Sequence, residues 1–226
     1  MSFLRTLFSG KKVLITAGPT YEPLDPVRFI GNHSTGKMGF ALARKLAEEG
    51  AEVYLVAGPT ALTLKHPLVH LTHVMTADEM YAACAQKAPE TDLWIFAAAV
   101  ADYKPKDTAT SKIKKTDASF TIELVKNVDI AANLGKEKRT DQFAVGFALE
   151  TDQELENARG KLHKKNLDMV VLNSLRDPGA GFKHDTNKIT IVKANTVEGY
   201  NLKAKDEVAQ DILESIKVEW ACLQKK

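Results

Sequence analysis

The sequence predicts an α/β fold in which a doubly wound, mostly parallel sheet is covered by helices on both faces. Two observations carry this prediction. Apolar runs alternate along the chain with segments of helical periodicity, and most of the runs are hydrophobic throughout instead of alternating with polar residues. Strands of that kind are buried on both faces of a sheet, which requires a layer of helices on each side. We therefore expect a Rossmann-like architecture.

The first predicted unit consists of a strand, a loop, a helix and a second strand. Residues 12–16 (KVLIT) form an apolar, β-rich run that ends in the turn sequence AGPT. Residues 36–49 carry an apolar stripe at helical spacing, and Gly50 follows where a C-terminal cap glycine is expected. Residues 51–58 (AEVYLVAG) form the second strand. The stripe of the helix consists of Met38, Leu42 and Leu46.

Capping boxes predict the starts of two further helices. In this motif a Ser or Thr side chain and a Glu three residues later satisfy backbone N–H groups of each other. Thr76 with Glu79 opens a helix before the strand LWIFAAAV, and Thr151 with Glu154 opens one after the strand FAVGFAL. The second of these helices is expected to bury an apolar face made of Leu155, Ala158 and Leu162.

The last predicted elements are the strand DMVVLN and a closing helix. The spacing of Val208, Ile212 and Ile216 predicts the apolar face of that helix. Two segments interrupt the alternation. Residues 103–125 predict a protruding loop and β-hairpin, and residues 176–192 predict a turn-rich loop before a late pair of strands. Excursions of this size are usually functional lids or interfaces.

The composition is that of an ordinary globular protein with one domain. The 226 residues suffice for one well-buried domain, and 31 Lys and Arg nearly balance 29 Asp and Glu, so no global field favours nucleic acid as a partner. No apolar run is long enough to span a membrane, and Cys84 and Cys222 belong to no metal-binding motif. We expect a cytoplasmic protein, with residues 1–10 as a leader or the remnant of a preceding domain and residues 11–226 as a single domain.

The segment GNHSTGKM, residues 31–38, differs by one residue from the phosphate loop GxxxxGK[ST]. Its last residue, Met38, cannot ligate magnesium, and the loop does not directly follow the first strand. A phosphate loop of that class is therefore excluded. Ser34, Thr35 and Gly36 nevertheless stand at the predicted start of a helix, where free N–H groups favour an anion. A plain helix cap without a ligand is the alternative interpretation.

Two further segments are candidates for binding. AAAVADY, residues 97–103, ends a predicted strand with small side chains followed by Asp102. At the carboxyl edge of a parallel sheet this would let a ligand approach the backbone, and the alternative is a tightly packed strand end. SKIKK places Lys112, Lys114 and Lys115 in the irregular excursion, where they form either a solvated basic loop or a clamp on a triphosphate.

Other enzyme classes that use this fold lack support in the sequence. No GxGxxG follows the first strand, and the second strand ends in Val56, Ala57 and Gly58 without an acidic residue for a ribose. No Tyr is followed by Lys four residues later, and no GxSxG or HExxH occurs. An NAD(P)-binding oxidoreductase is therefore disfavoured but stays the enzymatic alternative. A nucleotide-sensing module is the non-enzymatic alternative.

Seven segments, taken in order, resemble the phosphopantothenoylcysteine synthetase family, the phosphopantothenate-cysteine ligases of coenzyme A biosynthesis. They are ITAGPT, DPVRFIGNHSTGKMGF, AAAVADY, KIKK, KNVDI, GFALET and KKNLDMVVLN. The similarity as a whole extends from about Lys11 to Ile216. The sequence is similar to the bacterial form that uses CTP. That form often follows a flavin-dependent phosphopantothenoylcysteine decarboxylase in one chain, so the resemblance implies such a domain as a possible partner.

The resemblance implies a specific reaction. CTP would activate the carboxylate of 4'-phosphopantothenate as an acyl-cytidylate with release of pyrophosphate, and the amine of cysteine would then displace CMP. The resemblance further implies Mg²⁺ bound with CTP through ligands that the sequence leaves unnamed, no flavin in this chain, and neither nucleic acid nor membrane as a partner. It also implies a homodimer, for which the hairpin from Lys112 to Val125 is the candidate interface and flap.

The resemblance implies roles for individual residues. Asn32 would act on the acyl intermediate, where its amide could donate to a carbonyl oxygen that gains charge in the transition state, and Lys112 would lie on a flap over the nucleotide. The phosphopantothenate would be held by Asn32, Ala98, Ala99 and Asp102. The nucleotide would be contacted by Gly18, Ser34, Gly36, Asp102, Lys112, Val128, Asp129, Ile130, Ala131, Phe147, Lys161, Lys165 and Asn173.

Overall fold

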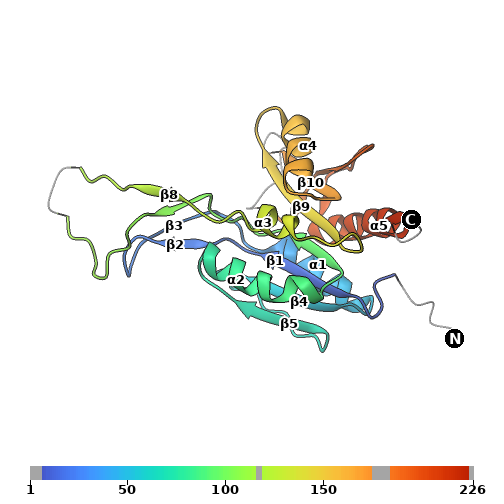
Figure 1. Cartoon of the computed structure of the whole chain (residues 1–226), viewed down its shortest axis with the longest axis horizontal. Coiled ribbons are helices and arrows are strands. Elements are labelled where there is room, and N and C mark those ends of the chain that lie inside the picture. The colour runs from blue at the N-terminus through green and yellow to red at the C-terminus, as the bar shows by residue number, and fades with distance from the viewer. Residues whose placement is uncertain (1–6, 116–118, 175–183, 224–226) are drawn as a thin grey trace.

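A computed structural model of the chain describes residues 7–115, 119–174 and 184–223 (Figure 1). In spatial order, the central eight-stranded sheet consists of β13 (Val197–Gly199), β12 (Ile189–Lys193), β10 (Met169–Ser174), β9 (Phe143–Glu150), β6 (Leu93–Phe96), β1 (Lys12–Ala17), β4 (Glu52–Ala57) and β5 (Val69–His73). The strands from β10 to β5 are parallel, and β12 and β13 are antiparallel additions at one edge. The predicted mostly parallel α/β sheet is confirmed.

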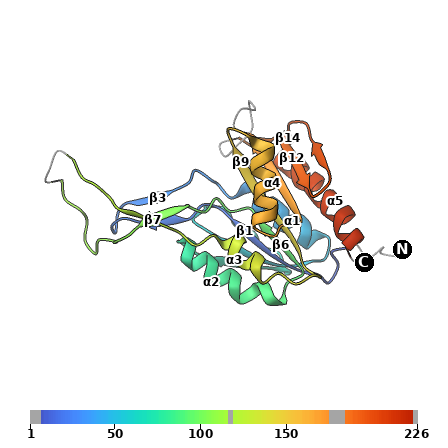
Figure 2. The same cartoon turned by 45° about the horizontal axis from the view of Figure 1, so that its top comes forward.

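Helices cover both faces of this sheet (Figure 2). One core lies between the sheet and two helices, α1 (Lys37–Glu48) and α5 (Lys205–Leu223). The other core lies under α2 (Ala77–Lys87), α3 (Ile130–Lys136) and α4 (Glu154–Lys164), with a short 3₁₀ helix η1 (Ala88–Glu90) after α2. Within β1, Val13 and Ile15 belong to the first core and Leu14 to the second, so the strand is buried on both faces. This burial explains its continuous apolar run.

One of the two expected capping boxes forms. At α2 the backbone N–H of Glu79 donates to Thr76 Oγ1 at 3.2 Å, and Glu79 Oε2 accepts from the N–H of Thr76 at 3.4 Å. The second box is wrong: α4 begins after Gln153 without a side-chain cap. Glu154 Oε1 accepts instead from Ser174 Oγ at 2.5 Å, which links α4 to β10. The expected apolar face of α4 is correct for Ala158 and Leu162, which are buried, and wrong for Leu155, which is 46% exposed.

The strand expected over residues 93–100 ends early, at Phe96. The following segment leaves the sheet ladder because its backbone bonds to the loop after β1. The N–H of Ala99 donates to the carbonyl of Gly18 at 2.9 Å, and the N–H of Ala98 donates to Thr16 Oγ1 at 3.2 Å. Residues 97–101 therefore lie at the carboxyl edge of the sheet as an irregular segment.

Two antiparallel ribbons form an arm that protrudes from the sheet, as Figure 1 shows. They pair β2 (Tyr21–Pro23) with β3 (Phe29–Gly31), and β7 (Tyr103–Pro105) with β8 (Leu124–Lys126). The protruding hairpin predicted for residues 103–125 is confirmed, but most of the strand expected in FTIELV is wrong, because β8 begins only at Leu124. A third ribbon pairs β11 (Thr186–Asn187) with β14 (Lys203–Ala204), and part of the loop expected over residues 176–192 lies outside the described residues.

Residues 7–10, expected to precede the single domain, make contacts with it. Phe8 is fully buried, and its ring lies 6.1 Å from that of Trp220 in α5, between ring centroids. The N–H of Gly10 donates to the carbonyl of Gly50 at 3.0 Å, which ties this segment to the end of α1. This segment therefore packs against the domain, and Phe8 belongs to its core. In the described part of the chain, no helix has the length and apolar character needed to cross a bilayer.

Candidate functional site

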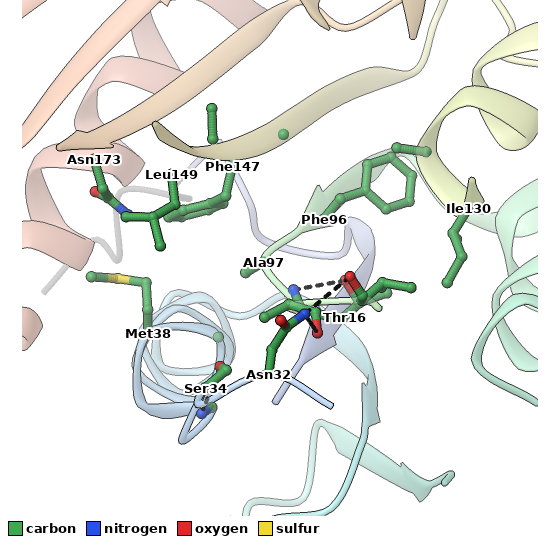
Figure 3. Close-up of a pocket in the computed structure, with 18 of the residues that line it drawn as sticks. Thr16, Asn32, Ser34, Met38, Phe96, Ala97, Ile130, Phe147, Leu149 and Asn173 are labelled. Atoms are coloured by element: carbon green, nitrogen blue, oxygen red, sulfur yellow. Dashed lines mark hydrogen bonds between the residues drawn. The ribbon is translucent and has the colours of Figure 1, made fainter. Parts of the chain in front are cut away.

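A cavity of about 390 Å³ opens at the carboxyl edge of the central sheet. Its walls come from the start of α1, the segment after β6, the connection between β8 and α3, the ends of β9 and β10, and the start of α5 (Figure 3). In open parallel sheets this edge is where ligands bind. The fold therefore places the cavity where the sequence predicted the site.

The first wall is the loop that leads into α1. Gly36 adopts φ +83°, a left-handed conformation that other residues rarely adopt, and its N–H donates to Ser34 Oγ at 3.4 Å. Ser34 and Gly36 both line the cavity, as expected. Gly18, also expected at the nucleotide, lies behind Gly36 instead. A Cβ on Gly36 would come within 3.3 Å of the Gly18 nitrogen, so the two glycines allow close backbone packing.

Asn32 connects this loop to the irregular segment after β6. Its Nδ2 donates to the carbonyl of Ala99 at 3.0 Å and to that of Val100 at 3.2 Å. Carbonyl oxygens only accept, so they fix which end of the Asn32 amide is nitrogen. Both amide hydrogens are thereby used, and Oδ1 is left as an acceptor. The structure differs here from the donor role expected for Asn32, because the backbone of residues 99 and 100 takes up its donors.

The second wall carries the expected Ala98, Ala99 and Asp102. An additional amide residue, Asn127, forms hydrogen bonds with the backbone of this wall. Asn127 Nδ2 donates to the carbonyl of Ala101 at 2.8 Å, and its backbone N–H donates to the carbonyl of Asp102 at 2.9 Å. Asn127 Oδ1 is buried without a partner among the described residues. No local sequence pattern indicates this role of Asn127, because it depends on a contact with a residue 26 positions away.

The third wall combines a helix start with two lysines. Asp129 Oδ1 accepts from the N–H of Ala132 at 3.0 Å and so caps α3, and Asp129 also pairs with Lys165 at 3.0 Å. Lys161 pairs with Glu150 at 2.6 Å. Both lysines line the cavity, although they are distant in sequence from the residues of the first two walls. Each could exchange its carboxylate partner for a phosphate of a bound ligand.

The fourth wall is apolar apart from one amide. Met38, Phe147 and Leu149 face Asn173 at the ends of β9 and β10 (Figure 3). Met38 was expected in the core with Leu42 and Leu46. Those two leucines are fully buried, whereas Met38 is partly buried and forms part of the cavity wall as well as the edge of the core.

Two lysines from distant parts of the sequence, Lys37 and Lys205, also line the cavity. Lys37 at the start of α1 pairs with Asp185 at 2.5 Å, and this hydrogen bond lowers the pKa of Asp185. Burial and the charge of Lys37 lower the pKa of Lys205 at the start of α5. The sequence places these residues far apart, and only the packing of α1 against α5 brings them together.

The structure brings most of the expected site residues together and leaves two outside. Lys112 lies exposed on the arm and does not line the cavity, and Gly18 lies behind it. No cluster of three or more His, Cys, Asp or Glu suited to a metal occurs among residues 7–115, 119–174 and 184–223. The expected residues that line the cavity are Asn32, Ser34, Gly36, Ala98, Ala99, Asp102, Val128, Asp129, Ile130, Ala131, Phe147, Lys161, Lys165 and Asn173.

Comparison with known proteins identifies the family. Residues 8–219 match the family model described as DNA/pantothenate metabolism flavoprotein C-terminal domain. This chain belongs to that family. A solved structure supports the assignment over nearly the whole chain. The crystal structure of the C-terminal domain of the coenzyme A biosynthesis bifunctional protein CoaBC has 40% sequence identity and a TM-score of 0.80, and the match covers 97% of this chain and 98% of that one.

Curated relatives of the family are longer than this chain. The coenzyme A biosynthesis bifunctional protein CoaBC of Vibrio parahaemolyticus is 43% identical over 95% of this chain and 54% of its own length. A protein named cysteine/cysteine sulfinic acid decarboxylase, from an unknown prokaryotic organism, is 52% identical over 92% of this chain and 58% of its own length. The chain thus spans a little over half the length of these relatives.

Proposed function

We propose that the protein is the ligase that joins cysteine to 4'-phosphopantothenate in coenzyme A biosynthesis. The observation that carries this proposal is the near-complete match to the C-terminal domain of CoaBC, at 40% identity over 98% of that structure. The cavity supports it, because the segments on which the resemblance rests, apart from the arm, meet around one space. The full reaction uses CTP and yields phosphopantothenoylcysteine, CMP and pyrophosphate.

The walls of the cavity suit activation of a carboxylate by a nucleotide. Small side chains at Ala98 and Ala99 let the acyl group lie against the backbone, and the start of α1 offers free N–H groups to an anion. Lys161 and Lys165 supply positive charge near the phosphates as pyrophosphate leaves. Such a step depends on positioning and charge neutralisation, so it needs no acid-base pair of side chains.

Asn32 is assigned to the second half of the reaction. Its Oδ1 is available as an acceptor, because Nδ2 is held by the carbonyls of residues 99 and 100. An acceptor at this position would orient the amine of cysteine toward the acyl carbon and take a hydrogen bond from it as the C–N bond forms. The acyl-cytidylate loses CMP in that step. Asn32 therefore matters more for amide formation than for activation.

Magnesium would reach the site bound to the triphosphate. Mg²⁺ is commonly held by one or two carboxylates together with substrate phosphates instead of a cage of protein ligands. Asp102 and Asp129 both line the cavity, so the residues present fit that arrangement. When bound, the ion would neutralise phosphate charge. The preference for CTP over ATP is part of this proposal and follows from the family resemblance.

A homodimer is proposed because the arm exposes an apolar surface. Tyr21 and Phe29 stack with ring centroids 3.8 Å apart, and Phe29 remains 52% exposed. A second copy that packs its arm here would bury this surface and bring Lys112 near a nucleotide. Sedimentation should show a dimer that Phe29→Ser weakens, and a monomeric wild-type protein would contradict this part. The exposed apolar residues of the arm include Val27, Phe29, Tyr103, Phe120 and Leu124.

The activation step gives the decisive test of the proposed function. Pyrophosphate release should follow addition of CTP, Mg²⁺ and phosphopantothenate without cysteine, and CTP should be used in preference to ATP. Lys112→Ala should slow this release without abolishing folding. If no pyrophosphate appears at high enzyme concentration, the proposal is wrong.

Two other functions have distinct outcomes in the same assays. A nicotinamide oxidoreductase would bind NADPH and show no affinity for CTP, and a nucleotide sensor would bind CTP without turning over a carboxylate. The decarboxylase name of one relative describes a protein of which this chain matches only 58%, so it does not locate that activity in the matched part. A flavin-dependent decarboxylase domain remains a proposed partner, and no flavin is proposed for this chain.

A further inference from the structure

At the apolar end of the cavity, the side-chain amide of Asn173 is oriented by a hydrogen bond from the side-chain amide of Asn187. In β9 and β10, Leu149 pairs with Asn173 and Phe147 pairs with Val171, so Asn173 stands beside the apolar side chains at the strand ends. Figure 3 shows Asn173 next to Leu149 and across from Met38, with its amide nitrogen on the side of Leu149. This end of the cavity is therefore suited to a flat, mostly apolar ring.

Asn187 fixes the orientation of Asn173. Asn187 is 3% exposed, and its Nδ2 donates to Asn173 Oδ1 at 3.0 Å. Asn187 Oδ1 accepts the backbone N–H of Lys188 at 3.1 Å. A backbone N–H can only donate, so it determines which end of the Asn187 amide is oxygen. Asn187 must then offer its NH₂ group, Asn173 must receive it with oxygen, and the NH₂ group of Asn173 turns to the cavity.

The frame that holds Asn187 is separate from the central sheet. Asn187 lies in β11, where it pairs with Lys203 of β14. Lys203 Nζ bonds both carboxylate oxygens of Asp211 in α5, at 3.0 and 2.7 Å. The orientation of the cavity amide is thus maintained by a ribbon attached to α5. Asn187 itself also lines the cavity, so the ribbon holds both amides at this end of it.

We propose that Asn187 is a positioning residue that keeps Asn173 as a hydrogen-bond donor, so that this end of the cavity selects a ring presenting an acceptor. The inference rests on the proposed function, in which this ring is the base of the nucleotide. The carbonyl oxygen and the unprotonated ring nitrogen of cytosine are acceptors of this kind. A ring without an acceptor there leaves a desolvated donor unpaired, which disfavours its binding.

Two substitutions at one position test the proposal. In Asn187→Asp the carboxylate accepts from Asn173, so the Asn173 amide turns and presents oxygen to the cavity. In Asn187→Ala the amide is released and can still donate. We expect the Kd for CTP, measured by calorimetry, to rise roughly tenfold or more for the Asp variant and about threefold or less for the Ala variant. An Ala variant as weak as the Asp variant would overturn the proposal.

Charge needs its own control, because the Asp variant also adds a negative group near an anionic ligand. Thr186→Asp adds the same charge one residue away without a contact to Asn173 and should raise the Kd much less. Added salt should remove the effect of Thr186→Asp and leave most of that of Asn187→Asp, since salt screens charge repulsion more than it changes amide orientation. Equal effects of the two Asp variants would refute the proposal.

A measurement without ligand separates this inference from the proposed function. In the NMR spectrum of the ligand-free wild-type protein, the side-chain NH₂ of Asn173 should show contacts to Leu149, and Asn187→Asp should abolish them. Unchanged contacts would overturn the inference even if CTP binds. Failure of CTP to bind the wild-type protein would instead reject the proposed function. Asn173→Asp, which also presents oxygen to the cavity, should weaken CTP binding and covers the case that Asn187→Asp does not fold.

Discussion

Asn32 gives the residue-scale test of how the two half-reactions are divided. Asn32→Ala removes the Oδ1 acceptor and the hydrogen bonds to residues 99 and 100. With saturating substrates we expect pyrophosphate release to continue, while amide formation with cysteine falls by about 100-fold, because the amine is no longer oriented. Asn195→Ala, at an exposed amide outside the cavity, is the control and should behave as the wild type. Equal loss of both half-reactions would remove the special role of Asn32.

The two cysteines are expected to differ in reactivity because one is buried and the other is exposed. Burial raises the pKa of Cys84 to about 12, whereas Cys222 is exposed. Since the thiolate is the reactive form, Cys84 is almost entirely an inert thiol at pH 8. A thiol reagent should therefore modify Cys222 alone in the folded protein, as mass spectrometry would show. Cys222→Ser should remain unmodified until denaturant is added, and rapid labelling of that variant under native conditions would contradict the prediction.

Several site residues could be predicted from the sequence because their positions follow from local rules. Ser34 and Gly36 precede a helix, and Ala98 and Asp102 follow a strand, so both groups lie at the carboxyl edge of the sheet. Asn127 and Asn187 obey no such rule. Each acquires its role from a hydrogen bond to a distant segment, and the polarity of an amide is decided only by that partner.

At the scale of elements, the two Thr-x-x-Glu motifs show why local patterns have limits. Both sequences satisfy the capping-box rule, yet only the one at Thr76 forms. Glu154 instead accepts from Ser174 of β10, a contact that no local window contains. The arm strands β2 and β3 escaped prediction for a similar reason, since three-residue strands carry too little periodicity to be recognised.

The joint between the two arm segments depends on one buried carboxylate. Asp25 accepts the N–H groups of Val27 and Arg28 at 2.8 Å each and that of Ile113 at 3.1 Å, and it pairs with the Arg28 guanidinium at 2.7 Å. Burial raises the pKa of Asp25, but these hydrogen bonds and the charge of Arg28 outweigh it and hold the pKa below the usual 3.8. The carboxylate therefore links loop 24–28 to the segment that carries Lys112.

This lowered pKa predicts how the arm responds to acid. The stabilisation is fully present above pH 3.8, the ordinary pKa of the group, and is lost as the pH falls through the lower folded-state value. Hydrogen exchange at Ile113 should accelerate over that acidic range. In Asp25→Asn exchange should already be fast at neutral pH and lose this acidic step. Asp107→Asn, at an exposed site on the same arm, serves as the control, and identical exchange in both variants would rule out the joint.

At the scale of the whole molecule, the cavity and an aromatic cluster of the core lie at opposite edges of the sheet. The cavity is built at the carboxyl ends of the parallel strands, whereas Phe8 precedes the amino end of β1. Phe8 packs against Trp220, whose ring in turn lies 6.2 Å from that of Phe143 at the start of β9. The fold class could be predicted from alternating apolar runs, but this aromatic cluster could not, since its members lie near the two chain ends and in the middle.

Phe8→Ala should therefore lower stability without altering the site. Truncation of a fully buried Phe costs about 3–5 kcal/mol, and urea unfolding should show a decrease of that size in the free energy of unfolding. At a temperature where the variant remains folded, its Kd for CTP should equal that of the wild type, because β1 separates Phe8 from the cavity. Val218→Ala, at a 63% exposed position of α5, should change stability by less than about 0.5 kcal/mol. An equally small effect of Phe8→Ala would contradict the place of Phe8 in the core.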